Sequence, residues 1–212
     1  MSSSFCSVSD SSSGNGDGGL ALNAVLKRPG ALAGAGSKVY IVENSENVVR
    51  AVDRKTGIIW TIIGGGDNTC YKGELPATDC RLLGPVGLFA DLDGNIYLTD
   101  HLDYTIKMMN GSTQMLRTIG GEAGIYKPFR DNTYALSATF FEPWGITADE
   151  DGMLFIADSQ NSRIRSMALA EKPTLAPMKP TGLPTTMPPS IAYPSVSIRS
   201  RVLTCYRHDG RA

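Results

Sequence analysis

Three acidic residues of the chain are each followed, seven residues later, by a basic residue, and a hairpin turn between them would place the opposite charges side by side. The three pairs are Glu43 with Arg50, Asp100 with Lys107, and Asp158 with Arg165. A set of such charges could form a ring that binds a ligand. Because the pair recurs with the same signs each time, we instead predict a structural ion pair that each copy of a repeated element needs.

The turns between acid and base differ from one another, which makes them the better candidates for binding. They cover Asn44–Asn47, His101–Tyr104 and Ser159–Ser162. His101 and Asp103 could act together as acid and base, or join a metal site. A zinc site needs three or four ligands and these turns supply one histidine, so we predict no catalytic residue, no metal and no cofactor. The predicted contact residues for a binding partner are Asn44, Glu46, Asn47, His101, Asp103, Tyr104, Gln160 and Asn161.

These residues belong to a sequence repeat. Residues 85–108 align without a gap on residues 143–166, 58 positions later, with Pro85 falling on Pro143. Residues 38–52 form a weaker third copy. Self-similarity at a fixed period indicates one supersecondary unit that is copied along the chain.

Each copy predicts a small antiparallel sheet. Short runs rich in β-branched and aromatic residues alternate with tight turns such as Asp93-Gly94 and Asn110-Gly111. Four strands joined in this way have apolar faces that one sheet cannot bury alone, so the copies are expected to stack like the blades of a β-propeller. We therefore expect the large aromatic residues to pack inside the stack, namely Trp60, Phe140, Phe141, Trp144 and Phe155.

The repeats lie between two segments that predict no folded structure. The fold class we predict is all-β, a partial β-propeller of four-stranded antiparallel blades with disordered tails. The predicted boundaries are a Ser-rich start at 1–13, a repeat region at 14–167 with blades at about 30–64, 86–120 and 144–167, and a Pro/Thr-rich tail at 168–212. The third blade shows no fourth strand in the sequence.

Composition narrows the choice of partner and compartment. The net charge of −1, from 20 basic and 21 acidic residues, disfavours a nucleic-acid partner. No run of about 18 apolar residues predicts a membrane span, and the first residues lack the features of a secretory signal. Cys70 and Cys80 flank the loop between the first two blades. A disulfide and two free thiols both remain open for them, and the compartment stays undetermined, with an extracellular location among the alternatives.

Three motifs together resemble NHL repeats: the Gly-Asp-Gly-Gly segment at 16–19, the Pro-x-Gly motif at 85–87, and the recurring acid and base of the hairpin. Gly145–Met167 is the best single copy, and the resemblance covers residues 14–167. It implies a β-propeller, which in this family is usually closed with five or six blades. Three blades fall short of that number. The chain is then a fragment, one half of a homodimeric ring, or a short open stack.

The resemblance also implies a range of functions. We favour a non-catalytic module that binds a protein partner through its rim loops. One alternative is a propeller enzyme of the lyase or lactonase/hydrolase type, with a metal in the central channel and further blades to complete its site. The other alternative is RNA binding through a basic face.

Overall fold

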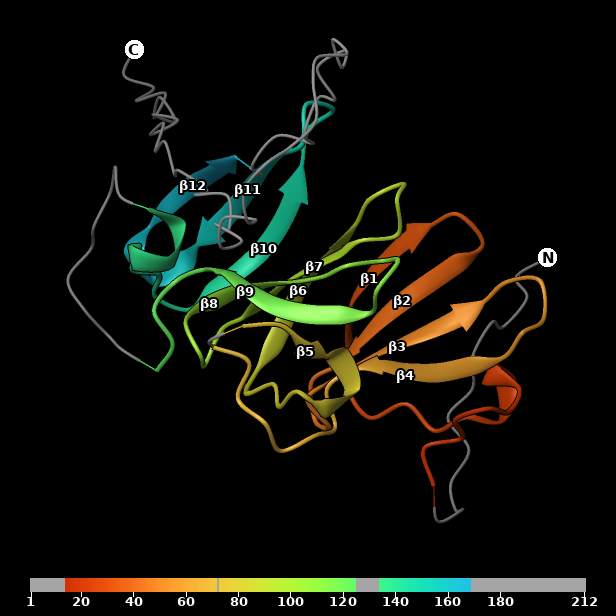
Figure 1. The fold of residues 1–212 in the computed structure, drawn as a ribbon. Helices are drawn as coiled ribbons and strands as arrows, with labels where there is room; N and C mark the ends of the chain where they lie inside the picture. Colours follow the sequence, from red (N-terminus) through yellow and green to blue (C-terminus); the bar gives the residue numbers. More distant parts are fainter. Residues whose placement is uncertain (1–13, 72, 125–133, 169–212) are drawn as a thin grey trace, which may run out of the picture.

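The computed structural model describes residues 14–71, 73–124 and 134–168, which fold as three antiparallel β-sheets lying one beside the next (Figure 1). The fold is all-β, as the sequence predicts, and the helical segments among these residues are three-residue 3-10 turns. The predicted tails fall outside the described residues, except for Ala168, which ends a strand. No described helix has the length and apolar character that crossing a bilayer would require.

Each sheet is a meander in which neighbours in sequence are neighbours in space. The first sheet consists of β1 (Pro29–Ala35), β2 (Lys38–Glu43), β3 (Val48–Asp53) and β4 (Ile59–Ile63). The second consists of β6 (Pro85–Ala90), β7 (Ile96–Asp100), β8 (Thr105–Met109) and β9 (Met115–Gly120). The third consists of β10 (Pro143–Ala148), β11 (Met153–Asp158) and β12 (Arg163–Ala168).

The linking segments add structure that the repeat pattern did not predict. A two-residue strand, β5 (Leu75–Pro76), pairs with the outer edge of β9 and makes the second sheet five-stranded. A 3-10 turn precedes the first strand of every sheet and buries its first alanine, and a fourth turn joins β11 to β12. These turns are η1 (Ala21–Asn23), η2 (Ala77–Asp79), η3 (Ala135–Ser137) and η4 (Ser159–Asn161).

The strand register repeats along with the sequence. Tyr97 lies opposite Phe89 and Met108 in the second sheet. Its counterpart in the third sheet, Phe155, lies opposite the residues 58 positions after those two. The first strand of each sheet also opens with a proline that faces the acid ending the second strand, and an irregularity in pairing follows. Because proline has no N–H to donate, it cannot complete the ladder at that point.

The core lies between the sheets, and successive residues of a strand point into different interfaces. In β7, Leu98 packs toward the first sheet and Tyr97 toward the third. Complete burial of a side chain such as Leu98 stabilises the fold by roughly 1.5–3 kcal/mol. Gly87 allows β10 to approach closely, because a Cβ there would collide with the backbone oxygen of Trp144. A sheet in this stack is thus buried on both faces when it has two neighbours.

A disulfide between Cys70 and Cys80 closes the loop that leads from the first sheet to the second. Both cysteines are buried in the core between these sheets. The hydroxyl of Thr118 in β9 donates to the carbonyl of Cys70 over 2.9 Å. The crosslink therefore anchors the loop at the place where two sheets must stay packed.

We expect reduction of this disulfide to lower the free energy of unfolding by about 2–3 kcal/mol, because the reduced chain regains the entropy of an open loop of this length. Thermal unfolding with and without dithiothreitol measures the effect. In the matched control, Cys70→Ser combined with Cys80→Ser, the reductant should change nothing. An unfolding temperature of the unsubstituted protein that is insensitive to reductant would contradict the prediction.

Candidate functional site

The acid and base of each repeat meet inside their sheet. Arg50 Nη1 lies 2.7 Å from Glu43 Oε1, Lys107 Nζ lies 3.2 Å from Asp100 Oδ2, and Arg165 Nη1 lies 2.9 Å from Asp158 Oδ2. All six residues are buried, with 0–1% of their surface exposed. Burial of this degree removes them from contact with a ligand in solution and gives them a structural role.

The same carboxylates also hold the backbone that leads into each sheet. The N–H of Lys27 donates to Glu43 over 2.7 Å, that of Leu83 to Asp100 over 3.1 Å, and that of Phe141 to Asp158 over 2.8 Å. These three donors occupy equivalent positions, two residues before the proline of the first strand. One carboxylate thereby joins the segment before the first strand, the end of the second strand and the cation of the third strand.

The buried cations of the first and second sheets find their second acceptor in different places. Arg50 reaches back to Asp17, 2.5 Å away, and to the carbonyl of Asn15. Lys107 instead pairs with Asp103 from its own hairpin and donates to the hydroxyl of Thr105. Lysine carries a compact charge and cannot span two distant acceptors as the guanidinium fork does. A nearer carboxylate therefore takes the place of the distant one.

The sequence predicts Asp103 as a contact residue for a partner, whereas the structure places it in the interior. Its side chain is 1% exposed and pairs with Lys107 rather than with His101. Tyr71 lies above this pair, with the ammonium of Lys107 5.7 Å from its ring centre. Burial and, next, the nearby Asp103 carboxylate raise the pKa of the Tyr71 hydroxyl to about 12.

His101 is committed to contacts within the protein. Its Nδ1 lies 2.7 Å from the carbonyl of Gly84, and because a carbonyl only accepts, this nitrogen is the donor. Its ring also meets Trp144 of the third sheet edge to face, with centres 6.2 Å apart. Among the described residues, no group of three or more His, Cys, Asp or Glu side chains is arranged to hold a metal ion.

Other predicted contact residues also join neighbouring parts of the fold. Asn44 donates to the carbonyl of Pro85 in the next sheet over 2.8 Å. Tyr104 packs edge to face on Phe141, again across a sheet boundary. Asn161 donates to Asp158, whereas Gln160 donates to Glu142 in an exposed position. Asn47, Tyr104 and Ser162 hold equivalent turn positions with φ between 50° and 59°.

These turns share one edge of the stack, which we call the first rim, formed by Asn44–Asn47, His101–Tyr104 and Ser159–Ser162. Two large apolar side chains stand out there: Leu102 is 53% exposed and Trp144 is 55% exposed. His101 precedes Leu102 in the chain, and its ring contacts Trp144. The expectation that Trp60 and Trp144 pack inside the stack is wrong, because both are exposed, whereas Phe140 is buried as expected.

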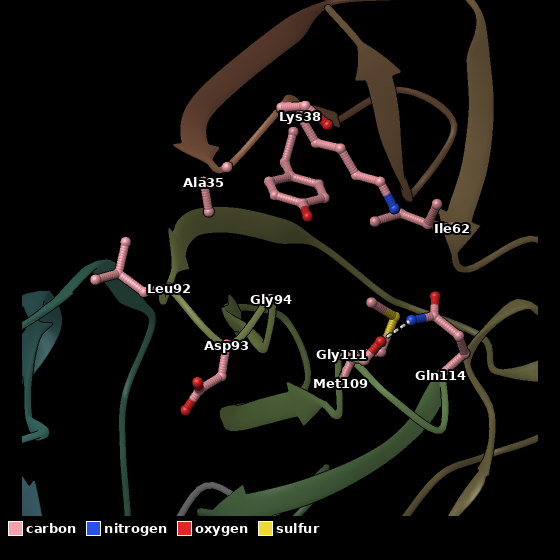
Figure 2. A pocket seen from close by; sticks show the side chains of 12 residues that line it. Ala35, Lys38, Ile62, Leu92, Asp93, Gly94, Met109, Gly111 and Gln114 are labelled. Carbon is pink, nitrogen blue, oxygen red and sulfur yellow. Dashed lines mark hydrogen bonds between the residues drawn. The ribbon is translucent and has the colours of Figure 1, made fainter.

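A cleft of about 220 Å³ opens at the opposite edge, the second rim, where the other turns of each sheet gather (Figure 2). It lies between the first and second sheets and is lined by side chains from both. Lys38 and Ile62 form one wall, and Leu92, Met109 and Gln114 face them across the opening. This cleft has no signature in the sequence, because its walls come from repeats that meet only after the sheets stack.

We expect Lys107→Met to lower the free energy of unfolding by about 3–5 kcal/mol, because it leaves the buried carboxylates of Asp100 and Asp103 without their cation. Urea unfolding measures the loss. Glu46→Gln is the control: it breaks the exposed pair with Lys27 and should cost less than about 1 kcal/mol. Equal costs for the two variants would contradict a structural role for the buried pair.

Comparison with known proteins supports the repeat interpretation. Protein SUPPRESSOR OF QUENCHING 1, chloroplastic, from Arabidopsis thaliana is 32% identical over 140 residues, which cover 62% of this chain and 13% of that protein. NHL repeat-containing protein 2 is 28% identical in Bos taurus and 27% identical in Homo sapiens, over 66% and 64% of this chain. The matched regions span 20% and 19% of those two proteins. No family model matches the chain.

A solved structure shares the fold. A protein of unknown function from Bacteroides thetaiotaomicron superposes with a TM-score of 0.53 at 21% identity, over 61% of this chain and 32% of its own. The two structures therefore share the arrangement of their sheets. The repeated antiparallel sheets and the similarity to NHL repeat-containing proteins together support an NHL-repeat β-propeller.

Proposed function

We propose that this part of the propeller is a non-catalytic interaction module that binds a protein partner through the first rim. The observation that carries the proposal is the exposure of Leu102 and Trp144, the first next to His101 in the chain and the second in contact with its ring. Tryptophan is over-represented among the residues that dominate binding energy in protein interfaces. Exposed apolar side chains that gather in one patch are typical of recognition surfaces.

The rest of the first rim suits this role. The exposed ion pair of Lys27 with Glu46 and the exposed Gln160 would supply a polar border around the apolar centre. Contacts across the sheet boundaries hold the turns in place, among them Asn44 to Pro85 and Tyr104 to Phe141. A surface held in this way loses little conformational entropy on binding.

We expect Leu102→Ser combined with Trp144→Ser to weaken capture of the partner at least roughly tenfold, because truncating a central interface residue typically costs more than 1 kcal/mol. Crosslinking followed by quantitative mass spectrometry identifies proteins held by the unsubstituted chain, and binding of each is then measured with both variants. Leu92→Ser is the matched control, because Leu92 is 97% exposed on the second rim.

Circular dichroism and thermal unfolding should match among these proteins, since the substituted side chains are exposed. Full capture by the double variant would refute the assignment to the first rim. Loss of capture with Leu92→Ser alone would move the contact surface to the second rim.

We propose further that the open face of the third sheet takes another sheet of the same kind from a second copy of the chain. Tyr40 and Tyr97 are covered by the sheet that follows them, whereas the equivalent Phe155 is only half-buried. A second copy packed head to tail would cover Phe155 and extend the ring.

Sedimentation at increasing concentration should show a dimer that Phe155→Glu converts to a monomer. Leu92→Glu is the control, because Leu92 is 97% exposed and lies in a turn of the second sheet rather than on the third. A monomer at all concentrations would exclude the second copy.

A further inference from the structure

The cleft on the second rim has a mixed lining, in which an apolar part lies beside the polar side chains of Ser37, Lys38, Asp93 and Gln114. Ala35 and Ile62 of the first sheet face Met109 of the second, and Leu92 stands at the mouth. The volume of about 220 Å³ is sufficient for one or two apolar side chains of a ligand. Figure 2 shows the opening between the two sheets, with Gln114 held in place by its hydrogen bond to the carbonyl of Gly111.

One side chain that lines this cleft carries a hydroxyl without a hydrogen-bond partner among the described residues. Tyr40 lines it and is 95% buried, being 5% exposed, and its hydroxyl makes no hydrogen bond to another described residue. Burial, with a smaller effect of Asp91, raises the pKa of this hydroxyl, which therefore stays protonated at neutral pH. A protonated phenol is available as a donor to an oxygen atom of a ligand.

Cations without ion-pair partners among the described residues line the adjoining surface. Lys38 lies at the wall of the cleft, and Arg54 and Lys55 line a second, more open hollow that shares Gly36 and Ser37 with it. None of the three forms a salt bridge with the part of the chain that the structure describes. Arg54 donates only to the carbonyl of Gly36.

Three acids lie nearby, Asp53, Asp91 and Asp93, and none of them forms an ion pair with these cations. Asp53 accepts hydrogen bonds from the backbone N–H groups of Lys55 and Thr56, which is the main reason that its pKa is lowered. Asp93 lines the far wall, and its carboxylate is turned away from Lys38 in Figure 2. Lys38, Arg54 and Lys55 thus have no direct ion-pair partner among the described residues, and each can donate to a carboxylate of a ligand.

We propose that this cleft binds an acidic peptide segment, with one apolar side chain between the sheets and its flanking carboxylates against Lys38, Arg54 and Lys55. An extended chain matches the arrangement, because the cleft and the hollow are continuous. Its backbone oxygen would accept from the Tyr40 hydroxyl. A nucleic acid fits less well: the ring of Tyr40 is buried and cannot stack on a base, and none of the other residues that line the cleft is aromatic.

The site is separate from the first rim, so its test is independent of the proposed contact through Leu102 and Trp144. The probe is a fluorescein-labelled heptapeptide of glutamates with one central leucine, and binding to the full chain is followed by anisotropy. We expect saturable binding that weakens with added salt. K38Q/R54Q/K55Q should weaken it roughly tenfold, the combined effect of three exposed ion pairs.

The matched control removes the same charge from the other rim. K27Q/R28Q/R163Q also replaces three exposed cations and should leave the affinity within about twofold. Tyr40→Phe keeps the ring and removes only the hydroxyl, and it should weaken binding several-fold. A peptide with glycine in place of leucine should bind more weakly than the original, because it leaves the apolar part of the cleft empty.

Four results would overturn the proposal. They are the absence of saturable binding, an equal loss in the two triple variants, equal affinity for the glycine peptide, and tighter binding of a labelled oligothymidylate that depends on the same three cations. The first three would reject the cleft as a peptide site, and the fourth would assign it to single-stranded nucleic acid.

Discussion

The carboxylate at the end of the second strand is the group on which each sheet depends. It faces a proline that has no N–H, so the start of the first strand cannot be secured by the ladder alone. In the second sheet, Asp100 instead accepts the backbone N–H of Leu83, while Lys107 balances its charge. A buried charge is tolerable only when it is paired and hydrogen-bonded, and these contacts supply both conditions. The repeat therefore conserves a pair of charges where an ordinary core would use apolar residues.

The same electrostatic requirement is met from different places in the chain. Arg50 is long and forked and reaches a second carboxylate, Asp17, in the segment before its sheet. Lys107 takes Asp103 from the adjacent turn. This exchange explains why Asp103, in a turn that varies between copies, resembles a binding residue in the sequence and yet lies buried. Variation within a repeat can reflect a local structural substitution as well as a function.

The two rims differ in chemistry although the sheets that form them are alike. On the first rim, Leu102 and Trp144 expose apolar surface around His101. On the second rim, Lys38 lines a cleft whose walls combine polar and apolar side chains. Strand positions are constrained by packing on both faces, so the turns are where the sheets can differ without loss of stability. The two proposed binding surfaces therefore rely on different chemistry.

The sequence by itself determined the strands, their turns and the partners within each charge pair, because these depend on residues close together in the chain and on a pattern that repeats. Only the tertiary structure decided which residues are buried between the sheets. Trp144 is exposed and Phe140 is buried, although both are aromatic residues near the start of the third sheet. It also decided the backbone donors to the carboxylates, the added strand β5 and the cleft beside Tyr40. Each of these joins segments far apart in sequence, and their contact is set by how the sheets stack rather than by any local preference.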